Sequence, residues 1–125
     1  MSSHIFSQDA PSPIGPYSQA VRAGDFIFIS GQLGINREGK MEEGIKEQTE
    51  RAIKNIEAIL KAAGSSLRDV VRVTVYLANI DDFGDMNEVY EKYFGDIKPA
   101  RVTVGGCKLP KNAKIEIEAV AYTGE

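Results

Sequence analysis

The segment from Gly44 to Gly64 constrains the fold most, because its apolar residues recur with the period of an α-helix. Lys, Glu and Gln fill the positions between them. One side of the helical wheel holds Ile45, Thr49, Ala52, Ile53, Ile56, Ile59, Leu60 and Ala63. Gly64 is typical of the residue that ends a helix, so we predict an amphipathic helix of about 18 residues. Such a helix buries its apolar side against another layer.

Runs rich in β-branched and aromatic residues predict a sheet as that other layer. We expect strands at Ala20 to Ala23, Phe26 to Ser30, Val70 to Ala78, Arg101 to Cys107 and Lys114 to Tyr122. A second helix is predicted to begin at Asp81 and Asp82, where carboxylates suit the positive end of the helix dipole, and to end at Gly95. The order of these elements indicates an α+β architecture, in one domain over residues 1–125.

Alternation within the strands divides the predicted sheet into an aliphatic face and a mixed face. The aliphatic face is expected to hold Val71, Val73, Val75, Leu77, Val102, Val104, Ile115, Ile117, Ala119 and Ala121. The mixed face is expected to hold Tyr76, Val120 and Tyr122 among Arg72, Thr74, Arg101, Thr103, Glu116 and Glu118. Two helices can cover only one face, and we expect them on the aliphatic one. The mixed face either lies in water or is covered by another subunit, and the pattern leaves both open.

The composition excludes several kinds of site. Lys and Arg number 15 against 18 Asp and Glu, and the net charge of −3 provides no basic field for nucleic acid or an anionic membrane. A single Cys and a single His exclude an internal disulfide and a Cys2His2 zinc site. No apolar run is long enough for a membrane span, and residues 1–9 lack the basic and apolar regions of a signal peptide. We therefore expect a cytoplasmic protein without a zinc site.

Several short motifs occur in a fixed order from one end of the chain to the other. They are Ala10-Pro11, Ile14 to Ala20, Ile29 to Gln32, Leu60 to Gly64, Asp82-Phe83, Met86-Asn87, Tyr90, Pro99 to Arg101, Leu109 to Lys111 and Ile115 to Ala121. The motifs PAR, LPK and IEIEAVA are the most specific at this spacing. With them the sequence resembles the RidA (YjgF) family of reactive intermediate deaminases, also described as endoribonuclease L-PSP.

The resemblance implies a Bacillus chorismate-mutase-like fold, in which a six-stranded mixed sheet carries two helices on one face. Three such chains form a homotrimer, in which the opposite sheet faces build an inner barrel and ligands bind in the clefts between subunits. The implied activity is hydrolysis of 2-iminobutanoate and 2-iminopropanoate, released by PLP-dependent dehydratases, to 2-oxo acids and ammonia. This activity needs no cofactor or metal.

The resemblance also assigns catalytic roles to three residues. Arg101 would hold the substrate carboxylate, because a planar guanidinium can bind both carboxylate oxygens. Glu116 would activate the attacking water and pass protons to the leaving ammonia, and Tyr17 would line the pocket. The residues alone do not choose between Glu116 and Glu118, which point the same way.

Five further residues are expected to contact the substrate: Ser30, Gly31, Asn87, Thr103 and Arg72. Gly31 would let a backbone N–H approach the ligand, whereas Asn87 would lie near the site or hold a loop. Thr103 stands where many bacterial members have Cys, and it should preserve carboxylate binding. Cys107 is not that family cysteine and is interpreted as a small packing residue. His4 is expected to be a bystander on an unanchored N-terminus.

Two other functions stay open. One is an endoribonuclease or translation inhibitor, as some family members are described. The other is a non-catalytic trimer that binds small carboxylates, in the manner of a holdase. The negative net charge and the lack of a basic patch with aromatic residues argue against binding RNA.

Overall fold

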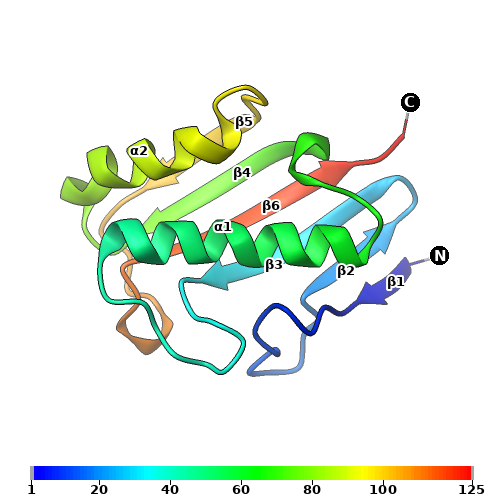
Figure 1. Ribbon diagram of the computed structural model, residues 1–125, viewed down its shortest axis with the longest axis horizontal. Helices are drawn as coiled ribbons and strands as arrows, with labels where there is room; N and C mark the ends of the chain where they lie inside the picture. The colour runs from blue at the N-terminus through cyan, green and yellow to red at the C-terminus, as the bar shows by residue number, and fades with distance from the viewer. Residues whose placement is uncertain (1, 125) are drawn as a thin grey trace.

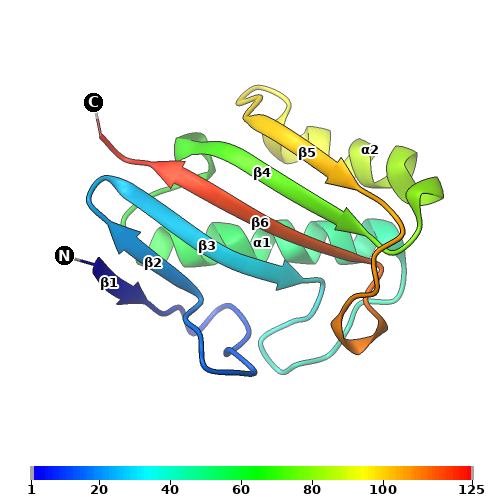
Figure 2. The ribbon, with the colours of Figure 1, turned by 180° about the vertical axis from the view of Figure 1, so that it is seen from behind.

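The structure is a computed structural model, and it describes residues 2–124. The helices and strands are β1 (Ser2–Ile5), β2 (Ala20–Ala23), β3 (Phe26–Leu33), α1 (Ile45–Ala62), β4 (Val70–Leu77), α2 (Phe83–Phe94), β5 (Ala100–Val104) and β6 (Ile115–Tyr122). Short 3-10 helices occupy Leu67–Asp69, Ile80–Asp82 and Pro110–Asn112. Both α-helices lie in front of the sheet in Figure 1, and Figure 2 shows its other face uncovered.

The six strands form one mixed sheet in the order β1-β2-β3-β6-β4-β5. All neighbouring pairs are antiparallel except β4 and β5, which are parallel and joined by α2. This arrangement confirms the α+β fold that the sequence predicts, a six-stranded sheet with two helices on one face. In the described part of the chain, no helix is both long enough and apolar enough to cross a membrane.

The N-terminal segment differs from the prediction. Ser2–Ile5 forms strand β1, in which His4 pairs with Val21 of β2, so the expectation of an unanchored N-terminus was wrong. This short, polar strand carries no β-branched run, and only pairing with an existing edge defines it. Strand β3 is also longer than predicted, because it continues through Gly31 to Leu33 with a register shift between Ile29 and Gln32.

The core lies between the helices and the face of the sheet they cover. Most of the predicted aliphatic residues are fully or almost fully buried there: Val73, Val75, Leu77, Ile115, Ile117, Ala119 and Ala121. The helix α1 contributes Ile53, Ile56 and Ile59, which are also fully buried. Val71 is an exception, with 45% of its surface exposed. A register shift between Val70 and Arg72 turns it out of the alternation, and Val70 takes the buried position instead.

Strand β5 presents its side chains in the opposite sense to the prediction. It pairs in parallel with β4, with Arg101 beside the buried Val73, and Thr103 beside the buried Val75. Neighbours in register share a face, so Arg101 and Thr103 belong to the helix side and not to the mixed face. Val102 and Val104 lie on the open face instead, where 50% and 41% of their surfaces are exposed.

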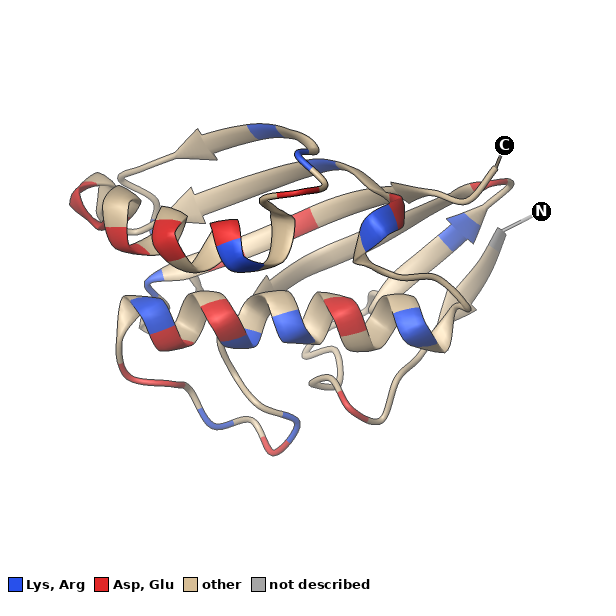
Figure 3. Cartoon of the chain, turned by 45° about the horizontal axis from the view of Figure 1, so that its top comes forward, with Lys and Arg blue, Asp and Glu red and all other residues tan. Residues whose placement is uncertain are grey.

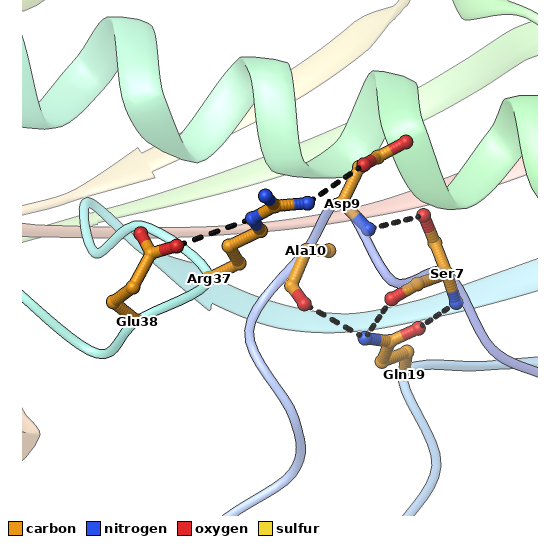
Figure 4. A network of polar contacts seen from close by, with 6 residues as sticks. All are labelled: Ser7, Asp9, Ala10, Gln19, Arg37 and Glu38. Atoms are coloured by element: carbon orange, nitrogen blue, oxygen red, sulfur yellow. Dashed lines mark hydrogen bonds and ion pairs between the residues drawn. The ribbon is translucent and has the colours of Figure 1, made fainter.

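The long loop between β1 and β2 is held by the buried side chain of Gln19. Its Oε1 accepts from the Ser7 N–H at 2.6 Å, and its Nε2 donates to the carbonyls of Ser7 at 3.1 Å and Ala10 at 3.4 Å (Figure 4). Arg37 also bridges to Asp9 of this loop at 3.5 Å. These bonds fix the loop that carries Tyr17.

Candidate active site

Glu116 lies half-buried on the open face, on β6 and beside Tyr76 of β4. Gly31 of β3 lies directly against it, because a Cβ atom at position 31 would overlap the Glu116 carboxylate. Only glycine therefore lets the strand and the carboxylate approach this closely. The predicted substrate residue Gly31 and the predicted catalytic residue Glu116 are neighbours in the structure.

The two candidate carboxylates differ in their contacts. The Tyr76 hydroxyl donates a hydrogen bond of 2.6 Å to Glu118, whereas Glu116 has no hydrogen-bond partner within residues 2–124. Burial raises the pKa of Glu116, and the nearby negative charge of Glu118 raises this pKa further. A carboxylate without a partner and with a raised pKa is better suited to proton transfer than one that is already hydrogen-bonded. The geometry therefore favours Glu116 over Glu118.

Tyr17 and Ser30 flank Gly31 in different ways. The side chains of Tyr17 and Ile14, with the backbone around Gly31, line a small hollow of about 30 Å³. Half of the Tyr17 surface is exposed. The Ser30 hydroxyl donates to the Ser18 carbonyl at 2.6 Å, so Ser30 holds the Tyr17 loop against β3. We call Tyr17, Ser30, Gly31 and Glu116 the Glu116 cluster.

A second group of predicted residues surrounds Arg101, on the helix side of the sheet. The Arg101 Nη1 donates a hydrogen bond of 2.8 Å to Oδ1 of Asn87 on α2. The hydroxyl of Thr103 is buried and has no hydrogen-bond partner among the described residues. Asn87 and Arg101 line a cavity of about 330 Å³ together with Tyr90, Lys98 and Pro99. We call Asn87, Arg101 and Thr103 the Arg101 cluster.

The Arg101 guanidinium keeps most of its hydrogen-bonding capacity free. Within residues 2–124 it forms no ion pair, and Asn87 accepts from only one of its five N–H groups. A guanidinium with unused donors at a cavity of this size can bind a small carboxylate through two hydrogen bonds.

The two clusters lie on opposite faces of the same sheet. The strands β5 and β6 flank β4, where Arg101 pairs with Val73 and Glu116 with Tyr76. Their Cα atoms are therefore roughly 14 Å apart, and their side chains point to different sides. One substrate molecule cannot contact both side chains within a single chain. Arg72 joins neither cluster, because it is exposed on the open face beside Val120.

Two aromatic residues at Arg101 are not among the predicted site residues. The Arg101 Cζ lies 4.6 Å from the ring centroid of Tyr90 and 5.5 Å from that of Phe83. Phe83 and Tyr90 belong to the sequence motifs that carry the family resemblance. Their spacing with Asn87 along α2 places all three residues on one side of the helix. Arg101 meets this side of α2 only because it lies on the helix side of β5. The sequence pattern predicted the opposite face for Arg101.

No three His, Cys, Asp or Glu side chains in the described part of the chain are grouped closely enough to hold a metal ion. Cys107 is partly exposed, and its backbone N–H donates to the Leu77 carbonyl at 3.0 Å. The two clusters supply a cation, a carboxylate and a phenol.

Comparison with known proteins identifies the family. A family model described as Endoribonuclease L-PSP matches residues 7–123. A RutC family protein of Pyrococcus abyssi is 59% identical over 120 residues, which is 94% of each chain. A protein of Dermatophagoides farinae named 2-iminobutanoate/2-iminopropanoate deaminase is 44% identical over 89% of this chain and 88% of its own.

A solved structure gives the same result for the fold. Escherichia coli TdcF, crystallised with bound serine, superposes with a TM-score of 0.93 at 36% identity, covering 98% of this chain and 99% of that one. Together the matches cover nearly the whole sequence and the whole sheet. The chain therefore belongs to the RidA (YjgF) family, the proteins described as endoribonuclease L-PSP.

Proposed function

We propose that this protein hydrolyses 2-imino acids, with 2-iminobutanoate and 2-iminopropanoate as substrates, to 2-oxo acids and ammonia. The observation that carries the proposal is the Arg101 guanidinium, which lines a small cavity with its donors unpaired by any acidic residue of the described chain. The Dermatophagoides farinae relative named for this activity supports it. The serine bound to TdcF also supports it, because serine carries a carboxylate on a small carbon skeleton.

The proposed roles follow from the chemistry of the substrate. Arg101 binds the substrate carboxylate through two charge-assisted hydrogen bonds. The imine reacts in its N-protonated form: Glu116 accepts a proton from water as the water oxygen bonds to the C=N carbon, which gives a neutral carbinolamine. Glu116 then returns this proton to the amine nitrogen and takes the hydroxyl proton as the C–N bond breaks, so that ammonia leaves and the carbonyl forms. Tyr17 orients the water or the substrate.

The separation of the two clusters supports a site completed by a second copy of the chain. The open face exposes large apolar side chains, among them Phe28, Val102 and Val104, more than a solvated face requires. A homotrimer that covers these faces would bring Arg101 of one subunit toward Glu116 of the next. The substrate would then lie in the cleft between subunits, and PLP-dependent dehydratases would be the source of the unstable imine.

A coupled assay tests the proposed function. A threonine dehydratase generates 2-iminobutanoate, and its loss is followed with and without this protein. We expect the wild type to accelerate the loss, and Arg101→Ala and Glu116→Ala to abolish the acceleration. Arg68→Ala, which removes an exposed arginine outside both clusters, is the matched control and should retain the wild-type rate. No acceleration by the wild type, or equal rates for the variants, would reject the proposal.

The family description makes RNA cleavage the second candidate. Along α1, however, Lys and Arg alternate with Glu, and this helix presents no basic stripe (Figure 3). Incubating single-stranded RNA with the purified protein and with Arg101→Ala separates the two functions. Cleavage by the wild type alone would support a ribonuclease, and intact RNA would leave the deaminase as the proposed activity.

A further inference from the structure

The side of α2 that faces β5 places three residues around one guanidinium. Phe83, Asn87 and Tyr90 follow one another at helical spacing, so they lie on the same side of the helix. Asn87 accepts a hydrogen bond of 2.8 Å from Arg101, while the rings of Tyr90 and Phe83 lie 4.6 and 5.5 Å from its Cζ. Both rings are within the distance at which an aromatic face attracts a cation.

Tyr90 is the better fixed of the two aromatic residues. Only 8% of its surface is exposed, and its ring packs on Phe94 with 4.7 Å between the centroids. Its hydroxyl is buried without a hydrogen-bond partner among residues 2–124, so ring packing and not the hydroxyl sets its position. Burial raises the pKa of Tyr90, although the charge of Arg101 opposes this rise, and the phenol is neutral near pH 7. Phe83 is far more exposed and lies farther from Arg101.

An aromatic support has an advantage over an acidic one at this position. A carboxylate paired with Arg101 would occupy its in-plane N–H donors and compete with the substrate. An aromatic face attracts the guanidinium from above the plane and leaves those donors free. Arg101 lies on the edge strand β5 and has a long side chain, which would otherwise sample many rotamers.

We propose that Tyr90 is a positioning residue. Its ring holds the Arg101 guanidinium so that the N–H donors point into the cavity where a substrate carboxylate binds. The proposal rests on the proposed function, because it takes Arg101 to be the carboxylate anchor. Tyr90 acts through Arg101, and the face of its ring, not its hydroxyl, positions the guanidinium.

Kinetics of three variants test this role. Tyr90→Leu removes the ring and should raise KM for 2-iminobutanoate about tenfold with a smaller change in kcat, because carboxylate binding is weakened in the ground and transition states alike. Tyr90→Phe keeps the ring and should stay near the wild type. Tyr93→Leu removes a neighbouring tyrosine that hydrogen-bonds Glu50 instead, and serves as the matched control. An unchanged KM in Tyr90→Leu, or an equal loss in Tyr90→Phe, would overturn the proposal.

Fluorinated phenylalanines at position 90 test this role without removing the ring. They keep the ring shape but progressively weaken its negative face, so KM should rise in steps with the number of fluorines. A KM independent of fluorination would overturn the cation–π role.

A spectroscopic measurement separates this proposal from the deaminase activity itself. The Arg101 Nε–Hε NMR signal, identified by its absence in Arg101→Lys, should be shifted by the ring current of Tyr90. In Tyr90→Leu it should move to the position of an exposed arginine, and in Tyr90→Phe it should not. If the wild type proves inactive on imines, this signal still tests the contact, and an unmoved signal in Tyr90→Leu contradicts it.

Discussion

Both faces of the sheet carry apolar side chains, but the faces differ in what covers them. On the helix side, Val73 and Ile117 are fully buried under α1 and α2. On the other side, Phe28 and Val102 leave 48% and 50% of their surfaces exposed. The first face is completed by the same chain. The second has no covering segment within residues 2–124 (Figure 2).

The candidate catalytic residues are divided in the same way. Arg101 belongs to the covered side, where α2 supplies Asn87 and Tyr90 around it. Glu116 belongs to the open side, against Gly31. If a second subunit covers the open face, then assembly and completion of the site are one event. The comparison of the two faces can therefore be tested by disturbing each of them separately.

The largest effect is expected from a charge on the open face. Val102→Lys should prevent assembly and reduce deaminase activity to background, because burying an unpaired ammonium between subunits costs several kcal/mol. Sedimentation equilibrium and the coupled assay measure the two effects on one sample. Ala62→Lys places the same charge on an exposed position of α1 and should change neither. An active, assembled Val102→Lys protein would show that the open face lies in water.

A smaller effect is expected from a cavity on the covered face. Ile56 is fully buried, and Ile56→Ala should lower the free energy of unfolding by about 2–5 kcal/mol. Val71 is a similar side chain that the register shift leaves exposed, so Val71→Ala should cost less than about 1 kcal/mol. Urea unfolding of the two variants measures the difference. Equal losses would contradict the exposure of Val71 and show that the two side chains are buried alike.

The sequence pattern predicted the elements of the fold well, because the helices and central strands have strong periodicity. It failed where an element depends on its neighbours. The five-residue β5 alternates Arg and Thr with Val, and only its register beside Val73 decides which set faces the helices. The choice of Arg101 and Glu116 came from motif resemblance, since neither residue type nor spacing distinguishes a catalytic charge from a solvated one. Their placement on opposite faces is a tertiary property that no local pattern contains.

The smallest effect is expected from the pair of carboxylates on the open face. The negative charge of Glu118 raises the pKa of Glu116, so Glu118→Gln should lower it. Glu116 must be ionised to accept a proton from water, and activity is lost as the pH falls through its pKa. The acid limb of the kcat/KM profile should therefore move to lower pH, by up to roughly one unit. Glu57→Gln, on the outer side of α1, is the control, and a limb that stays in place or moves upward would exclude Glu116 as the base.

Mixing two inactive variants tests the composite site most directly. Arg101→Ala and Glu116→Ala are unfolded together at equal concentration, refolded, and assayed on 2-iminobutanoate. If each site takes Arg101 from one subunit and Glu116 from the next, random assembly restores roughly a quarter of the wild-type activity, because half of the chains supply each residue. If both residues act within one chain, no mixed assembly contains an intact site. Activity no higher than that of the separately refolded variants would contradict a site shared between subunits.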